Sequence, residues 1–124
     1  MSESKNYIKK EQDGGSIQIS DEVIAAITAA AVKDVDGVYG LNGNLGNDIA
    51  SIFGVKNPGK GVKMVMTESN VAVECNVIVK YGQNIVEIAK AVQVSVAKAI
   101  EEMTGIHVDL VNVNICGIAL PENK

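Results

Sequence analysis

The chain has 124 residues, 47% of them apolar and 21% charged, which is enough for one domain with its own core and too little for two. The net charge of -4 comes from 15 acidic residues against 11 lysines, and the sequence contains no arginine. Because arginine is the usual bidentate ligand of phosphate groups, this composition argues against a nucleic-acid partner.

Residues 1–15 are polar and end in two glycines, which predicts a flexible N-terminal arm. They lack the apolar segment of a signal peptide, and no apolar run in the chain approaches the roughly 18 residues of a membrane span. We therefore expect a cytoplasmic protein with no direct membrane insertion.

Residues 16–20, SIQIS, alternate polar and apolar side chains, as in a short strand with one buried face. Ser20 can then cap a helix that runs to about Asp34 and is ended by Gly37. Its apolar stripe consists of Val23, Ile24, Ile27 and Ala31.

Four alanines cover much of the remaining surface of this helix: Ala25, Ala26, Ala29 and Ala30. Small side chains favour either tight packing on a sheet or a helix contact between subunits. On the second alternative, Ala25 and Ala29 are candidate interaction residues.

Residues 38–61 are rich in glycine and asparagine and predict a long connection that is either functional or mobile. Within it, NDIASIF could form one or two helical turns. These turns would present Ile49, Ile52 and Phe53, either packed onto the core or exposed as a docking surface.

The segment GVKNPGKG, residues 54–61, resembles the phosphate-binding loop G-x-x-x-x-G-K-[ST] but has Gly61 where a hydroxyl is required. Such a loop needs a helix after it, so that the helix N-terminus faces the phosphates. The residues after Gly61 alternate like a strand instead. A nucleotide-binding enzyme is therefore kept only as a remote alternative.

Residues 62–68 and 71–81 predict an antiparallel hairpin with a short joint at Ser69 and Asn70. One face of the hairpin is apolar: Val62, Met64, Met66, Val71, Val73, Cys75, Val77, Val79 and Tyr81. The other face is mostly polar and can face water: Lys63, Val65, Thr67, Ala72, Glu74, Asn76, Ile78 and Lys80.

The last two elements are a long helix and a strand. Asn84 is a possible cap of the helix and Gly105 its expected end. Its apolar positions recur at helical spacing: Ile85, Ile88, Ala89, Val92, Val96, Ala99, Ile100 and Met103. The strand changes phase between Ile106, Val108, Leu110 and Val111, Val113, Ile115, which predicts a bulge near residues 110–111 or a segment covered on both sides.

The order β-α-β-β-α-β predicts one α+β domain over residues 16–120, followed by a tail at 121–124. We expect a two-layer sandwich, with one small antiparallel or mixed sheet and both helices on one face of it. This architecture alone does not determine a function.

Groups that could support catalysis are few. His107 is the only histidine and is expected to face water, and Cys75 and Cys116 are expected to be reduced and mostly buried. Asp34, Asp36 and Asp48 could hold a metal, but acids at a helix end before a glycine are more typical of a polar helix exit. We therefore expect no catalytic residue, no cofactor and no metal site.

Taken together, these segments resemble the alkaline shock protein family, small cytosolic envelope stress response proteins of Gram-positive bacteria. The resemblance covers about residues 15–118 and rests on the order and spacing of GSIQIS, DVDGVYGL, VIVKYGQNI, VQVSVAKAIEEMTGI and VDLVNVNICGI.

The resemblance implies a non-enzymatic protein-interaction module that supports cell-envelope homeostasis. Such a module would form a homo-oligomer and bind a membrane-anchored partner, which would hold it at the inner surface of the cell membrane. The resemblance also implies an alternative, in which the protein is a regulatory partner of acetyl-CoA carboxylase or a fatty-acid kinase in lipid synthesis.

Overall fold

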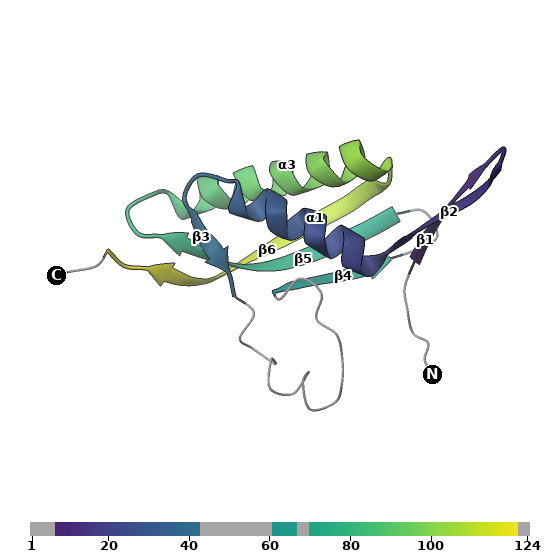
Figure 1. The fold of residues 1–124 in the computed structure, drawn as a ribbon. Coiled ribbons are helices and arrows are strands. Elements are labelled where there is room, and N and C mark those ends of the chain that lie inside the picture. Colours follow the sequence, from purple (N-terminus) through teal and green to yellow (C-terminus); the bar gives the residue numbers. More distant parts are fainter. Residues whose placement is uncertain (1–6, 43–60, 67–69, 122–124) are drawn as a thin grey trace, which may run out of the picture.

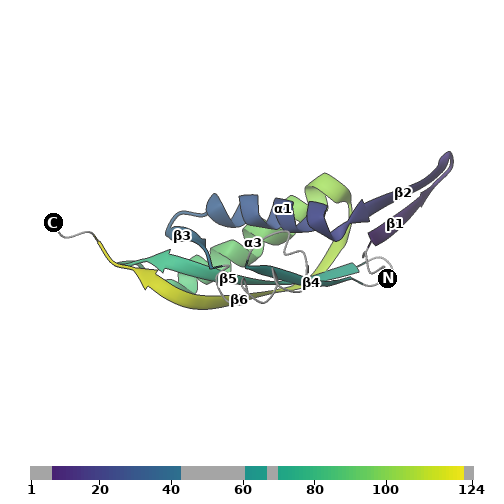
Figure 2. The same cartoon turned by 60° about the horizontal axis from the view of Figure 1, so that its bottom comes forward.

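The computed structural model of the protein describes residues 7–42, 61–66 and 70–121. Two helices cover one face of a four-stranded sheet, and two further strands form a hairpin (Figure 1). In chain order the elements are β1 (Tyr7–Gln12), β2 (Gly15–Ser20), α1 (Asp21–Lys33), β3 (Val38–Leu41), β4 (Val62–Met66), β5 (Asn70–Lys80), α3 (Ile85–Thr104) and β6 (His107–Ala119). The predicted α+β sandwich with both helices on one face is confirmed (Figure 2).

β5 is the central strand of the sheet and has partners along both edges. β6 runs parallel to it over its whole length, from the pair Asn70 and His107 to the pair Lys80 and Ala119. The opposite edge is shared by two antiparallel strands, with β4 beside residues 71–75 and β3 beside residues 77–79. The sheet is therefore mixed, and β3 and β4 together act as one interrupted edge strand.

The two parts of this edge strand meet at Asn76. The Asn42 amide donates a hydrogen bond to the Asn76 carbonyl oxygen at 2.9 Å, and the Asn76 amide donates to the Gly61 carbonyl oxygen at 2.8 Å. The sequence did not predict β3, because four residues with a glycine among them carry a weak strand signal. Residues 38–41, predicted to be the start of a long connection, therefore form a strand of the sheet instead.

Gly61 leads directly into β4, as predicted, so a strand and not a helix follows the GVKNPGKG segment. A helix N-terminus, which a phosphate-binding loop requires, is therefore missing at this end of the segment. Gly54, Gly59 and Lys60 lie outside the described residues.

The core lies between the sheet and the two helices. Every second residue of β5 from Val71 to Val79 is buried, as the alternation predicted. Each such side chain contributes about 1.5–3 kcal/mol relative to an exposed one. α3 completes the core with Ile88, Val92, Val96 and Ile100.

Three positions of the two helices and β5 that were assigned to the core from their spacing are exposed instead, because each lies at or beyond the end of its element. Val23 is in the first turn of α1, Tyr81 follows β5, and Met103 is in the last turn of α3. The hydrophobic periodicity thus predicted which face of each element is buried, but not how far along the element the burial extends.

Both ends of α3 follow the predicted residues, whereas α1 departs from them: its C-cap is Asp34, three residues before the predicted Gly37. Asn84 Oδ1 accepts a hydrogen bond from the Glu87 amide at 3.0 Å, and Gly105 ends α3 in a left-handed conformation with φ of 75°. Ser20 occupies the N-cap position of α1, but its side chain makes no capping hydrogen bond. Within the described part of the chain, no helix combines the length and apolar content that crossing a bilayer requires.

The N-terminal region differs from the flexible arm expected for residues 1–15. β1 pairs with β2 in an antiparallel hairpin that is separate from the main sheet and extends away from the body (Figure 1). Ile17 in β2 is consequently exposed, where the alternation predicted a buried face. A second strand before the helix was not predicted, because residues 7–12 are mostly polar.

The phase change predicted in the last strand is confirmed as a bulge. The register between β5 and β6 shifts once between Val108 and Leu110 and again between Ile115 and Gly117. The first shift leaves Leu110 half exposed on the outer face while Val111 is buried. The second shift, at Cys116, was not predicted.

Candidate interaction surfaces

The two cysteines occupy opposite environments. Cys75 is fully buried, and this burial, followed by the charge of Glu74, raises the pKa of its thiol to about 11. The predicted burial is confirmed, and the thiol is therefore protonated and unreactive at neutral pH. Cys116 is exposed, contrary to expectation, because it lies at the second bulge of β6.

The single histidine faces water at the start of β6, as predicted. Its Nδ1 lies 3.4 Å from Glu101 Oε2 and its Nε2 lies 3.6 Å from Asp109 Oδ1, with 67% of the side chain exposed. Across residues 7–42, 61–66 and 70–121, no group of three or more His, Cys, Asp or Glu side chains is placed to hold a metal ion. Of the acids considered from the sequence, Asp48 lies outside these ranges.

The interaction residues predicted on the first helix are corrected in part. Ala25 is fully buried against the core, so no partner can reach it in the folded chain. Ala29 is half-buried. Ile49, Ile52 and Phe53, the other predicted interaction residues, lie outside the described residues.

The face of the sheet opposite the helices is covered by none of the described elements, and we call it the open sheet face (Figure 2). The strand registers place these positions on it: Lys63, Val65, Ala72, Glu74, Asn76, Ile78, Lys80, Leu110, Asn112, Asn114 and Gly117. At its centre, Asn114 Nδ2 donates to Glu74 Oε2 at 2.7 Å and to Asn76 Oδ1 at 2.9 Å. These hydrogen bonds join polar side chains of β5 and β6 across the centre of the face.

One end of the open sheet face is apolar. Val65, Ala72 and Leu110 lie in one row across β4, β5 and β6. The side chains of Val65 and Leu110 are 67% and 49% exposed, on either side of the small Ala72. A depression of about 240 Å³ lies beside Val65 and Ala72 of this row, and it is also lined by Lys63, Glu74 and Asn112.

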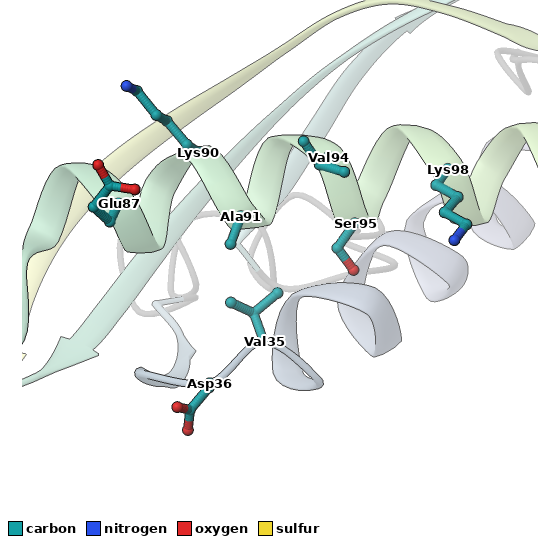
Figure 3. A pocket seen from close by; sticks show the side chains of 8 residues that line it. All are labelled: Val35, Asp36, Glu87, Lys90, Ala91, Val94, Ser95 and Lys98. Carbon is teal, nitrogen blue, oxygen red and sulfur yellow. The ribbon is translucent and has the colours of Figure 1, made fainter.

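A second surface lies on the helix side, where the end of α1 meets α3. Here a wide, open groove of about 620 Å³ is lined by Val35, Asp36, Glu87, Lys90, Ala91, Val94, Ser95 and Lys98. Val35 and Ala91 face each other between the two helices (Figure 3). Ser95 Oγ donates to the Ala31 carbonyl oxygen at 3.2 Å and so joins α3 to α1 beside the groove.

The sequence patterns did not single out either surface. Val65 and Leu110 were assigned to strands, but their alignment in one row depends on the parallel pairing of β5 with β6. The isolated apolar Val94, among charged residues on the outward side of the second helix, was the available signal for the groove. Its significance depends on α1 lying alongside, which periodicity does not show.

The sequence matches the model of the alkaline shock protein 23 family, described by a cell envelope-related function, over residues 9–120. The uncharacterized protein YqhY of Bacillus subtilis (strain 168) is 32% identical over 104 residues, covering 84% of this chain and 77% of that protein. A stress response regulator gls24 homolog of Streptococcus pyogenes (serotype M3) is 28% identical over 112 residues, covering 87% of this chain and 61% of that protein.

Among solved structures, a variant of the MamM CTD matches 82% of this chain and 96% of its own, with 13% sequence identity and a TM-score of 0.48.

Proposed function

Because the chain belongs to the alkaline shock protein 23 family, which is described as having a cell envelope-related function, we propose that it is a non-enzymatic protein-interaction module. The module supports the envelope stress response by binding a membrane-anchored protein and further copies of itself. The relatives named stress response regulator homologs support the stress-related part of this role.

The observation that carries the proposal is the apolar row on the open sheet face. Exposed apolar side chains with a polar rim are typical of protein-interaction sites, where the apolar centre supplies affinity and the rim supplies orientation. Val65 and Leu110 form such a centre, and Lys63, Glu74 and Asn112 form the rim.

The shape of this surface favours a protein over a small molecule. Small-molecule sites are concave and usually enclose about 300–1,000 Å³. The depression beside Val65 and Ala72 is smaller, at about 240 Å³. A partner that lays a helix or a strand across the sheet would cover both Val65 and Leu110 at once.

The test is crosslinking in cells followed by mass spectrometry, comparing the natural chain with a Val65→Glu, Leu110→Glu variant. Both positions are exposed, so the variant is expected to fold, which circular dichroism checks. We expect the natural chain to crosslink to a membrane-anchored protein and the variant to lose that crosslink. Lys80→Glu, at the far end of the same face, is the matched control and should retain it.

Other outcomes separate the alternatives. Crosslinks to acetyl-CoA carboxylase subunits or a fatty-acid kinase would support the regulatory role in lipid synthesis instead. If the double variant keeps every crosslink of the natural chain, the open sheet face is not the binding surface.

A further inference from the structure

The groove beside α3 contains a regularly spaced stripe of side chains. Glu87, Ala91, Val94 and Lys98 are separated by four, three and four positions. On a helix this spacing places them in one row along a single face. The core residues Val92 and Val96 lie on the other side of α3, so the row points away from the sheet.

The stripe has opposite charges at its two ends and apolar side chains between them. Glu87 stands at one end with Asp36 nearby in the same groove, and Lys98 stands at the other end (Figure 3). Among the described residues, the side chains of Glu87 and Lys98 make no ion pair. Val94 is 68% exposed although it lies at the centre of the stripe.

When two copies of this stripe are placed side by side in opposite directions, the acidic end of each lies beside the basic end of the other. We infer that the α3 groove binds the α3 groove of a second copy of this chain, with the two helices antiparallel about a two-fold axis. With the axis midway between Val92 and Gln93, Glu87 opposes the partner's Lys98, and Ala91 opposes the partner's Val94. Each contact then occurs twice, as an isologous interface requires.

The arrangement is complementary in size as well as in charge. The small Ala91 leaves room for the partner's Val94, and Val35 borders that space from the end of α1. Asp36 adds a second acid at the end that receives the partner's Lys98. Lys90 lies at the flank of the stripe, beside the contact and not within it (Figure 3).

The interface joins two molecules through their helix layers, so that the order of layers becomes sheet, helices, helices, sheet. Both open sheet faces remain on the outside, where another protein can bind. The stripe from Glu87 to Lys98 covers only about 16 Å of one helix, a contact too short to bury the roughly 800 Å² per partner of a standard stable interface. The dimer is therefore weak, dependent on concentration and weakened by salt.

A second copy of the chain is thus the partner of one surface of the proposed interaction module, and the role of this dimer in the cell rests on that proposed function. Charge exchange tests it in analytical ultracentrifugation. Lys98→Glu places acids against the partner's Glu87 and Asp36, and Glu87→Lys places two lysines together. We expect each single variant to weaken the dimer at least tenfold. Lys80→Glu, on the opposite face and outside the apolar row and its rim, is the control and should leave the dimerisation constant unchanged.

The decisive measurement mixes the two single variants, E87K and K98E. In a mixed dimer, the lysine introduced at position 87 of one chain faces the glutamate introduced at position 98 of the other, and the remaining natural pair is also opposite in charge. We expect the mixture to dimerise as well as the natural chain, although neither variant does so alone. A natural chain that stays monomeric up to millimolar concentration, or a mixture that stays monomeric, would overturn the inference.

A second readout does not depend on charge. In a Cys116→Ser background, Ala91→Cys mixed with Val94→Cys should form an interchain disulfide faster than either variant alone. The tests of the two proposals fail separately: the Val65→Glu, Leu110→Glu variant should still dimerise, whereas Lys98→Glu should lose the dimer in pure protein with no other partner present.

Discussion

Gly37 lies where the end of α1 meets the start of α3. Its φ is 96°, a conformation that residues with a side chain rarely adopt, and a Cβ there would come within 2.8 Å of both Gln83 Oε1 and Ile88 Cδ1. Ile88 is part of the core and cannot move freely. We expect Gly37→Ala to lower the free energy of unfolding by about 2 kcal/mol or more, measured by urea denaturation.

Gly40 provides the matched control for this substitution. It lies in the neighbouring strand β3, where an added Cβ would meet no atom within 4 Å and where φ is not positive. Gly40→Ala should therefore change stability by less than about 0.5 kcal/mol. Equal losses from the two substitutions would contradict the close approach of α1 and α3 at Gly37.

Cys75 makes stability depend on pH in the alkaline range. Its thiol has a pKa of about 11 in the folded chain against 9.0 as the ordinary value. Between these pH values the thiol loses its proton in the unfolded chain but keeps it in the folded chain. The stability that Cys75 contributes is therefore complete below about pH 9 and is lost as the pH rises to about 11. We expect a loss of about 2–3 kcal/mol over this range.

The measurement is urea denaturation of the natural chain and of Cys75→Ala from pH 8 to about pH 11. The variant is needed to separate the effect of Cys75 from that of lysines and tyrosines, residue types that titrate in the same range. The variant should be less stable at pH 8 and should show a smaller loss at high pH. Cys116→Ser is the control, since this thiol is exposed. Identical pH profiles for the natural chain and Cys75→Ala would show that Cys75 is not desolvated.

At the scale of elements, the start of α3 depends on one side chain. Asn84 Oδ1 accepts a hydrogen bond from the Glu87 amide, one of the backbone donors that have no partner in the first turn of a helix. Asn84→Ala should cost about 1 kcal/mol in thermal or urea unfolding, and Asn84→Asp should retain most of the stability. If alanine and aspartate behave alike, the cap does not stabilise the helix.

Elements with a strong period could be predicted from the sequence, and weak or short ones could not. α3 and β5 follow their hydrophobic repeats closely, because burial against a single core imposes these repeats. β3 is too short to show a period, and β1 is held by pairing with β2 and not by burial. The two candidate surfaces were missed for a related reason, since each is formed where residues of different elements meet.

At the scale of the whole molecule, β5 is the most protected element. It is bonded to β3 and β4 on one edge and to β6 on the other, and every second side chain from Val71 to Val79 is buried. The β1–β2 hairpin has the opposite character, because β1 pairs with β2 alone and most of the hairpin is exposed. Two-stranded hairpins on their own are only marginally stable in water.

This contrast predicts which part of the chain opens first. In native-state hydrogen exchange, amides of β5 should exchange only through global unfolding, whereas amides of β1 should exchange orders of magnitude faster through local opening. Removing residues 1–14 should then leave the free energy of unfolding within about 1 kcal/mol of the natural chain. The reason is that the contact of β1 with the body is an exposed hydrogen bond of 3.4 Å, from Lys10 Nζ to the Gly105 carbonyl oxygen, and such a bond contributes little. A loss of several kcal/mol on truncation, or slow exchange throughout β1, would show that the hairpin is part of the cooperative body.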